Sequence, residues 1–374
     1  MADAKIMVMT WNQELARTEE RDIEPLFPFI KHQKPDIIVI GLQEAAPTKG
    51  KVAIGSGNYV GALIAKKILG VEYEFVGQRS FAGITKGKQL VTGRAHQVIE
   101  VLKRRRSNLR VDDVHFHDHS ISLVSEKGFL TAMMKLNGNP FVFLSTHLDA
   151  KSADKREKLA KEAMRYVQKW LKGSPANVSM VVMGDMNYRA VREKSGALGA
   201  DESSLLLQNL ATPSGRRNLM RLDSFVVEGD PTAEVSGSMD RAPAALRHFN
   251  VNWPRFNSHA FPTYKRSVKT KDPGYQVWRK IASSMEFITE GLIIPGKNVS
   301  EDELKSALSV YTKHGAIKEK RAGYYDFGWL DRIGYRLKPP LRIQRGAPVS
   351  LNTLVAVTGG DHVPVYLMLN LSGF

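Results

Sequence analysis

Five apolar runs of the sequence end in polar side chains of the types that bind metal ions or phosphate groups. The runs end at Asn12 (IMVMTWN), at Glu44 (IIVIGLQE), at His147 (FVFLSTH), at Asp185 and Asn187 (VVMGDMN), and at Asp361 and His362 (TLVAVTGGDH). Ligands of α/β proteins lie beyond the ends of the strands, so side chains placed this way converge on one edge of a sheet. We therefore expect the five run ends to form one site.

The chemistry that these residue types can do together is the hydrolysis of a phosphate ester. The reaction needs a metal ion that neutralises the phosphate, a base that orients water, and donors to the phosphoryl oxygens. Mg²⁺ prefers oxygen ligands and keeps several waters, so the Glu44 carboxylate and the Asn12 amide oxygen suffice as protein ligands. Asp185 is then the candidate general base, and Asn187 holds the same water or phosphate.

Two histidines are candidate donors to the phosphoryl oxygens. His147 and His362 each follow an apolar run, and Asp331 and Asp361 are acids that can orient an imidazole and favour its charged form. Each polar residue alone has a simpler explanation, because Asn is common in turns and a lone histidine is usually structural. Their recurrence at strand ends favours a shared site.

The elements that must position these residues alternate between strand and helix patterns, which predicts an α/β fold. Strands are expected at residues 5–10, 37–40 and 178–183, and on both sides of a hairpin at Asn137-Gly138. The clearest helix runs over 153–172, with apolar residues on one face and Lys and Arg on the other. Residues 77–122 read as irregular and basic. We expect one domain over 1–374, with candidate insertions at about 82–122 and 266–322.

The composition favours a polyanionic partner. The 374 residues carry a net charge of +16, which suits nucleic acid, an anionic membrane or a phosphorylated small molecule. The absence of cysteine excludes disulfides, zinc–thiolate sites and thiol nucleophiles. No apolar stretch reaches the ~20 residues of a membrane-spanning helix, and the first residues lack the pattern of a secretory signal.

Several motifs together resemble the inositol polyphosphate 5-phosphatase family, a branch of the magnesium-dependent endonuclease/exonuclease/phosphatase superfamily. They are GDMNYR (184–189), FPTYK (261–265), GWLDRI (328–333) and GDHVPV (360–365), and TWN (10–12), GLQE (41–44), VGQRS (76–80) and EKG (126–128) match in the expected order. The resemblance covers nearly the whole chain. It implies a DNase I-like fold, a four-layer α/β sandwich in which two packed mixed β-sheets are flanked by helices.

The resemblance also implies roles for the matched residues of the reaction centre. Asn12 and Glu44 would hold Mg²⁺ with Asp361 beside it, His147 would contact the scissile phosphate, Asp185 would activate water, Asn187 would position water and phosphate, and Asp331 would orient His362.

Further matches imply contacts with the substrate. Tyr264 and Lys265 match the element that grips the inositol 4-phosphate, Lys127 matches a lysine near the 1-phosphate, and Arg189 and Arg332 are assigned support or substrate contacts. One departure from the family is the change of SHLAAH to THLDAK, which puts Asp149 close to the phosphate-contacting histidine.

The activity implied is magnesium-dependent removal of the 5-phosphate from the inositol ring of phosphoinositides, and also of soluble inositol polyphosphates. The expected partners are that substrate and an anionic membrane surface, not nucleic acid. The expected location is the cytoplasm, peripheral at membranes, with a secreted effector acting in a host cell as the alternative. Two other functions stay open: a magnesium-dependent nuclease of the same superfamily, which the charge suits equally, and an inactive phosphoinositide-binding module.

Two clusters lie outside these motifs. The basic run KRRR at 103–106 is a candidate contact with anionic lipid, and a solvated surface is the alternative. His115, His117 and His119 alternate and would share one face of a strand, where they form a candidate second metal site.

Overall fold

The computed structural model describes most of the chain. The described residues are 3–14, 19–45, 60–61, 64, 72–83, 95–120, 127–150, 152–189, 202–229, 239–240, 242–257, 260–264, 286–287, 293–294, 300–311, 319–321, 324–325, 328–354, 357 and 360–374. No helix within these ranges is long and apolar enough to cross a membrane.

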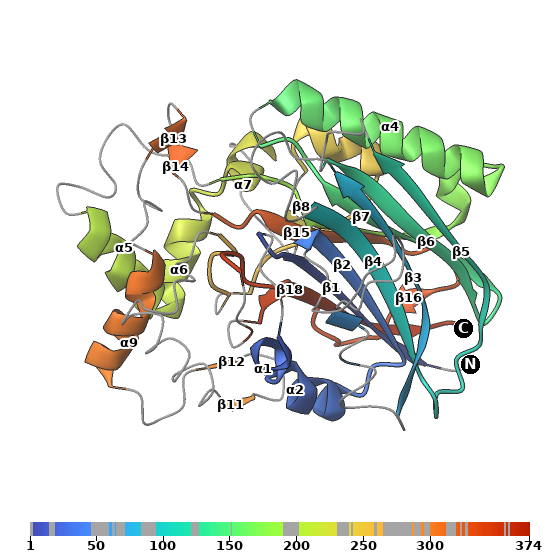
Figure 1. Ribbon diagram of the computed structural model, residues 1–374, viewed down its shortest axis with the longest axis horizontal. Helices are drawn as coiled ribbons and strands as arrows, with labels where there is room; N and C mark the ends of the chain where they lie inside the picture. Colours follow the sequence, from blue (N-terminus) through green and yellow to red (C-terminus); the bar gives the residue numbers. More distant parts are fainter. Residues whose placement is uncertain are drawn as a thin grey trace.

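One face of the core is a seven-stranded mixed sheet (Figure 1). Its strands run in the order β16 (Arg342–Ile343), β18 (Val365–Ser372), β1 (Ala4–Asn12), β2 (Ile37–Ala45), β4 (Ala95–Arg104) and β3 (Tyr73–Gly83), and β17 (Asn352–Thr353) also pairs with β18. The β1–β2 pair is parallel and the other pairs are antiparallel. The apolar runs that predicted β1 and β2 are buried along almost their whole length, as expected for strands covered on both faces.

A second, five-stranded sheet packs against the first. Its order is β15 (Asp331–Arg336), β8 (Ser179–Asp185), β7 (Asn139–His147), β6 (Gly128–Leu136) and β5 (Val111–Ser120). Here β7 and β8 are parallel, and the remaining pairs are antiparallel. The predicted hairpin joins β6 to β7. Asn137 and Gly138 both have positive φ, 49° and 81°, which is the conformation of a tight two-residue hairpin turn.

The two sheets approach each other closely where β2 crosses β7. A Cβ added to Gly41 would lie 2.7 Å from Ser145 Oγ, so the absence of a side chain permits this approach. Gln43 Nε2 also donates to Ser145 Oγ at 3.2 Å across the interface. Around these polar contacts, the facing side chains of both sheets form one buried apolar cluster.

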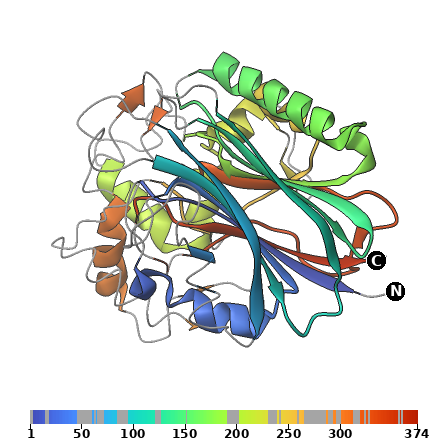
Figure 2. The same cartoon turned by 45° about the vertical axis from the view of Figure 1, so that its right-hand side comes forward.

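Helices cover the outer faces and complete the four layers (Figures 1 and 2). Helix α4 (Ala153–Leu171) lies on the five-stranded sheet, and α1 (Glu20–Ile23) and α2 (Leu26–Gln33) lie at the seven-stranded one. The α4 helix begins at Ser152, whose side chain accepts a hydrogen bond from Lys155 N, and its apolar face packs in a second buried cluster against the sheet. The predicted four-layer α/β sandwich is therefore confirmed.

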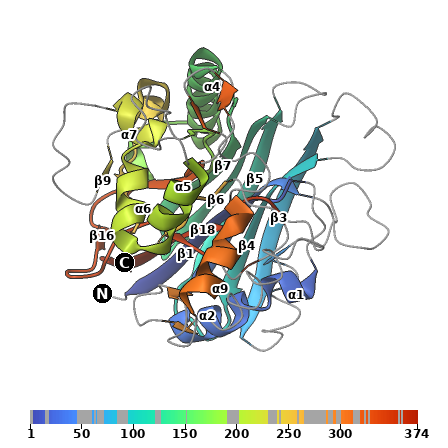
Figure 3. The same cartoon turned by 90° about the vertical axis from the view of Figure 1, so that its left-hand side faces the viewer.

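The remaining elements are short. Helices α5 (Glu202–Ala211), α6 (Pro213–Met220) and α9 (Glu301–Leu308) gather beyond one end of the sheets (Figure 3). The other helical elements are α7 (Ser224–Gly229) and the 3₁₀ turns η2 (Pro175–Asn177), η3 (Ala244–Phe249) and η4 (Ser309–Tyr311). The other described strands form two-stranded ribbons: β9 (Met239–Asp240) with β10 (Trp253–Pro254), β11 (Glu286–Phe287) with β12 (Ile293–Ile294), and β13 (Glu319–Arg321) with β14 (Tyr324–Tyr325).

The structure corrects the expectation that 77–122 is irregular. Residues 95–104 form β4, which lies between β2 and β3, and 111–120 form β5, the edge of the other sheet. The charged end of β4 and the polar composition of β5 masked the strand pattern. Most of the other candidate insertion, 266–322, lies outside the described residues.

Candidate active site

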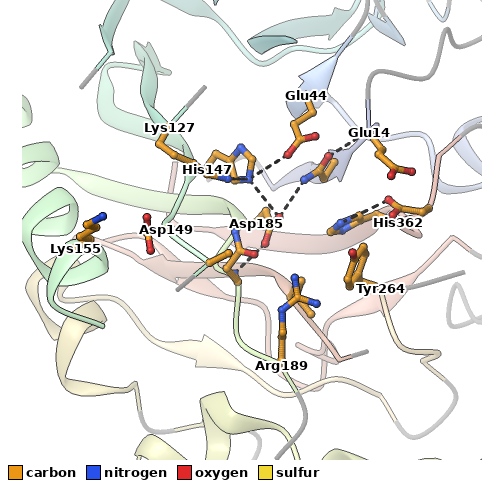
Figure 4. Close-up of a pocket in the computed structure, with 15 residues that line it drawn as sticks. Glu14, Glu44, Lys127, His147, Asp149, Lys155, Asp185, Arg189, Tyr264 and His362 are labelled. Carbon is orange, nitrogen blue, oxygen red and sulfur yellow. Dashed lines mark hydrogen bonds and ion pairs between the residues drawn. The ribbon is translucent and has the colours of Figure 1, made fainter. Parts of the chain in front are cut away.

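A cavity of about 460 Å³ lies where β1, β2, β7 and β8 end. Figure 4 shows its lining side chains pointing toward one another from both sheets. The lining residues are Asn12, Glu14, Glu44, Lys127, His147, Asp149, Ala150, Lys155, Asp185, Asn187, Arg189, Tyr264, Leu330, Asp361 and His362. All five apolar runs singled out in the sequence therefore end at one place.

Strand register explains this convergence. In the parallel β7–β8 pair His147 lies beside Asp185, and in the antiparallel β15–β8 pair Asp331 lies beside the same aspartate. In the other sheet, the parallel β1–β2 pair places Asn12 beside Gln43, one residue before Glu44. Parallel strands end at the same edge, so residues far apart in sequence meet there.

Gly184 is required for the approach of β8 to β7 at this edge. Its φ is +145°, and a Cβ built there would lie 1.8 Å from Thr146 O. Only glycine fits this conformation and this space, which explains the glycine directly before Asp185. Glu44 and Asn187 also have positive φ, 48° and 57°, so both turn away from regular strand geometry at the site.

Asp185 is the most constrained group in the cavity. It is 2% exposed, its Oδ2 accepts a hydrogen bond from Asn12 Nδ2 at 3.0 Å, and its Oδ1 accepts one from Asn187 N at 2.8 Å. Burial opposes ionisation, but the hydrogen bond with His147 and the positive charges of His147, His362 and Lys127 hold the pKa of Asp185 well below its usual range. The carboxylate is therefore ionised and fixed in place.

His147 stands between three charged groups. Its Nε2 lies 3.5 Å from Asp185 Oδ2 and 3.6 Å from Glu44 Oε1, and it also contacts Lys127 Nζ. Its Nδ1 has no hydrogen-bond partner within the described ranges. These contacts place the Lys127 ammonium and the His147 imidazole directly beside the carboxylates.

His362 is held by Asp331. Its Nδ1 lies 2.7 Å from Asp331 Oδ2, and Trp11 Nε1 donates to its backbone carbonyl at 3.1 Å. Burial favours a neutral imidazole, but the Asp331 carboxylate outweighs it and raises the pKa of His362 to about 9. Thr263 Oγ1 accepts hydrogen bonds from Leu330 N (2.8 Å) and Asp331 N (3.2 Å), which fixes the start of β15.

The oxygen donors in the cavity fit a hard divalent cation. Asn12 Oδ1 accepts one hydrogen bond, from Glu14 N at 3.1 Å, and an amide oxygen can make two interactions. The Glu44 side chain is 21% exposed at the cavity wall, and Asp361 lines the same wall. The described part of the chain contains no group of three or more His, Cys, Asp and Glu residues arranged as a metal site. A cation held by few protein oxygens and several waters is what these donors suit, and Mg²⁺ binds in this way.

The predicted substrate side of the cavity is only partly described. The Tyr264 ring lies 4.5 Å from the His362 ring, and the Arg189 guanidinium lies 4.8 Å from the Tyr264 ring centre. Backbone hydrogen bonds in both directions between Tyr264 and Gly328 join the FPTYK and GWLDRI segments. Lys265 lies outside the described residues.

Arg332, for which support and substrate contact were both left open, is not among the residues that line the cavity. It is 1% exposed, pairs with Asp223, and its guanidinium lies 4.0 Å and 5.0 Å from the ring centres of Phe225 and Phe256. Side chains alternate along a strand, so Arg332 and Asp331 point to opposite faces of β15. The contacts of Arg332 therefore favour the supporting role over a contact with substrate.

Five cavity residues were not assigned a role in the predicted site: Glu14, Asp149, Ala150, Lys155 and Leu330. Lys155 belongs to the first turn of α4, and Figure 4 shows it near Asp149 at the edge of the cavity. The sequence carried a signal that Lys155 lies near the cavity, because its helix begins only a few residues after His147.

The histidines outside the motifs are engaged separately. The His117 ring stacks on Trp170 at 4.4 Å, and His119 Nε2 lies 3.3 Å from Glu162 Oε1 of α4. These contacts explain His117 and His119 as packing between β5 and α4.

Comparisons with known proteins add to this geometry. Residues 9–209, more than half of the chain, match the Endonuclease/Exonuclease/phosphatase family 2. No curated protein matches the sequence.

Two similar solved structures share the fold. One is the inositol polyphosphate 5-phosphatase domain of SpSynaptojanin in complex with inositol (1,4)-bisphosphate and calcium ion, with a TM-score of 0.55, 16% identity, and coverage of 99% of this chain and 84% of that one. The other is Cimex nitrophorin in its ferrous NO complex, with a TM-score of 0.56, 14% identity, and coverage of 100% and 99%. At such identities the likeness shows the DNase I-like fold, and the two structures hold different ligands, so the chemistry must be argued from the site.

Proposed function

The chain belongs to the Endonuclease/Exonuclease/phosphatase family 2, and from that premise we propose that it is a magnesium-dependent phosphomonoesterase that removes the 5-phosphate from inositol phosphates, with phosphoinositides as its main substrates. The family and the fold support a phosphoesterase of this hydrolase superfamily. The substrate, the metal and the reaction position are the proposal.

The observation that carries the proposal is the setting of Asp185. This carboxylate is buried, ionised and held by Asn12 and by the backbone N–H of Asn187. A carboxylate fixed in this way can orient an attacking water and accept its proton. Asn187 is itself anchored, because its Nδ2 donates to Leu148 O at 2.8 Å.

The opposite wall supplies donors for the phosphoryl oxygens. The Nδ1 of His362 is engaged by Asp331, and its Nε2, which lies 3.8 Å from Asp361 Oδ1 in the lining of the cavity, is the proposed donor. Fixed, charged donors of this kind stabilise the charge that develops on the transferring phosphate. Lys127, which contacts His147, adds positive charge on the other side of Asp185. A divalent metal held by Asn12 and Glu44, with Asp361 beside it, would neutralise the phosphate.

One feature of the cavity supports an inositol phosphate over a nucleic acid. Arg189 and Tyr264 form a cationic and hydroxyl-bearing wall beside His362, suited to a second phosphate on the same small substrate. The similar SpSynaptojanin domain was solved with an inositol bisphosphate, which is consistent with this choice.

A catalytically inactive binding module is disfavoured because the reacting groups lie together in one cavity with the contacts that catalysis requires. We propose that the protein works in the cytoplasm at membrane surfaces. A location in a host cell, as a secreted effector, would serve the same chemistry.

A substrate panel tests the proposal. Phosphate release is measured from phosphoinositides and soluble inositol phosphates that differ in whether they carry a 5-phosphate, with Mg²⁺ or with a chelator, beside a duplex DNA cleavage assay. Release only from 5-phosphorylated compounds, and only with Mg²⁺, supports the proposal. Cleavage of DNA without phosphate release from any inositol compound would replace it with the nuclease.

A further inference from the structure

The solvent-facing side of α4 carries a continuous row of basic residues. Lys158, Lys161, Arg165 and Lys169, with the C-cap residue Lys172, follow one another at spacings of three or four residues, and we call them the α4 basic stripe. Residues at these spacings share one face of a helix. All five are exposed, and the row is about 21 Å long at 1.5 Å per residue.

Acidic residues next to the stripe lie on its flanks. Each of two glutamates pairs with one stripe residue and with one histidine of a neighbouring element: Glu157 with Lys161 (2.6 Å) and His248 (3.2 Å), and Glu162 with Arg165 (3.6 Å) and His119 (3.3 Å). Within the described ranges, Lys158, Lys169 and Lys172 have no ion-pair partner. The stripe is therefore a row of a single sign of charge and not an alternation of salt bridges.

Aromatic side chains border the stripe on the side of β5. Tyr166 and Trp170 are half-buried, and the charged groups of Arg165 and Lys169 lie 5.4 Å and 6.0 Å from the Tyr166 ring centre. Basic residues beside partly exposed tyrosine and tryptophan are typical of surfaces that rest on lipid headgroups. The charge alone would suit nucleic acid equally, and aromatic rings can also stack on unpaired bases, so nucleic acid is kept as the alternative outcome of the test.

The α4 basic stripe begins close to the cavity. Lys155 lines the cavity and lies three residues before Lys158 on the same helix. The basic run at 103–106 is placed differently: β2 pairs Ile37 with Lys103 at one end and Ala45 with His96 at the other. The run therefore lies about 26 Å along the strand from the cavity end, and its Arg104 is engaged by Asp36 at 2.5 Å.

We propose that the α4 basic stripe docks the protein on an anionic membrane, on bilayer lipids such as phosphatidylserine. Docking through this face keeps the rim of the cavity at Lys155 next to the membrane, whereas docking through 103–106 would turn the cavity away. The surface binds by charge, independently of turnover. The choice of a membrane over nucleic acid rests in part on the proposed phosphoinositide substrate.

Vesicle binding of two matched variants tests the docking surface. The stripe variant carries Lys158→Gln, Lys169→Gln and Lys172→Gln. The control carries Lys31→Gln, Lys34→Gln and Arg106→Gln, which removes the same charge from exposed positions; α2, which contains Lys31 and is capped by Lys34, lies across the molecule from α4 (Figure 1). Lys34 and Lys172 are both C-cap residues with left-handed backbone conformation, so each variant replaces one residue of this kind.

Sedimentation with vesicles of phosphatidylcholine and phosphatidylserine, free of phosphoinositide, gives the partition coefficient of each protein. We expect wild type to bind these vesicles and not phosphatidylcholine alone. The stripe variant should lose roughly 100-fold in partition, from about 1 kcal/mol for each basic residue at the surface, and the control should stay close to wild type. Both variants should hydrolyse a soluble inositol phosphate at the wild-type rate.

Three results would overturn the proposal: no binding of wild type to phosphatidylserine vesicles, an equal loss in both variants, or tight stripe-dependent binding to duplex DNA without vesicle binding. Failure of the proposed function is a separate result, because the vesicles contain no substrate. If the protein binds vesicles through the stripe yet releases no phosphate from any inositol compound, the docking surface stands and the proposed function fails.

Discussion

The buried pair of Arg332 and Asp223 offers a sharp test of the structure, because it separates a structural role from a substrate contact. Arg332→Met removes the cation and keeps an unbranched chain between the rings of Phe225 and Phe256. Asp223 is 2% exposed, so the variant leaves a buried carboxylate without its counter-ion. The hydrogen bond from Phe225 N to Asp223 Oδ1 (3.0 Å) would remain.

Removing one partner of a buried ion pair costs about 3–5 kcal/mol of unfolding free energy. With an unfolding entropy of about 2.1 cal/mol/K per residue over 374 residues, a loss of about 4 kcal/mol lowers the melting temperature by about 5 °C. The double variant Arg332→Met with Asp223→Asn removes the uncompensated charge and should recover most of that loss. Urea unfolding and thermal melting measure both effects.

Steady-state phosphate release well below the melting temperature completes the test. We expect KM of Arg332→Met to equal that of wild type, because the side chain lies on the face of β15 opposite to Asp331. A variant that has the melting temperature of wild type but a raised KM would refute this reasoning and indicate that Arg332 contacts the substrate.

Three further variants test the reaction centre. Asp185→Asn keeps the size of the side chain and should lower kcat by about 10²–10⁴-fold; substantial remaining activity would exclude Asp185 as the base. Gly184→Ala should destabilise the protein far more than Gly138→Ala in urea unfolding, since both have positive φ but only Gly184 would meet a backbone oxygen, Thr146 O at 1.8 Å. Glu44→Gln should raise the Mg²⁺ concentration for half-maximal phosphate release about 10-fold or more. If the variant needs the same Mg²⁺ concentration as wild type, Glu44 is not a ligand of the metal.

The sequence predicted well which residues come together in the cavity, because strand ends are a strong geometric constraint. Asn12, Glu44, His147, Asp185 and His362 each follow an apolar run, and parallel pairing brings such ends to one edge. The register could not be read from the runs themselves. It needs both partners of each pair, which only the folded sheets supply.

Residues that depend on side-chain direction were harder to predict. Arg332 lies next to Asp331 in the same motif, yet the two point to opposite faces of β15, and motif membership carries no such information. Lys155 was missed because it reaches the cavity from a helix and not from a strand end. Strands β4 and β5 were missed because charged and polar residues dominate parts of both.

The position of the bond that is cut tests the central claim most directly. The measurement is ³¹P NMR of the product formed from inositol 1,4,5-trisphosphate with Mg²⁺, which shows which ring phosphate is lost. We predict loss of the 5-phosphate resonance alone, growth of inorganic phosphate, and retention of the 1- and 4-phosphate signals. Loss of another phosphate, or an unchanged spectrum from a folded protein that cleaves DNA, would contradict the account.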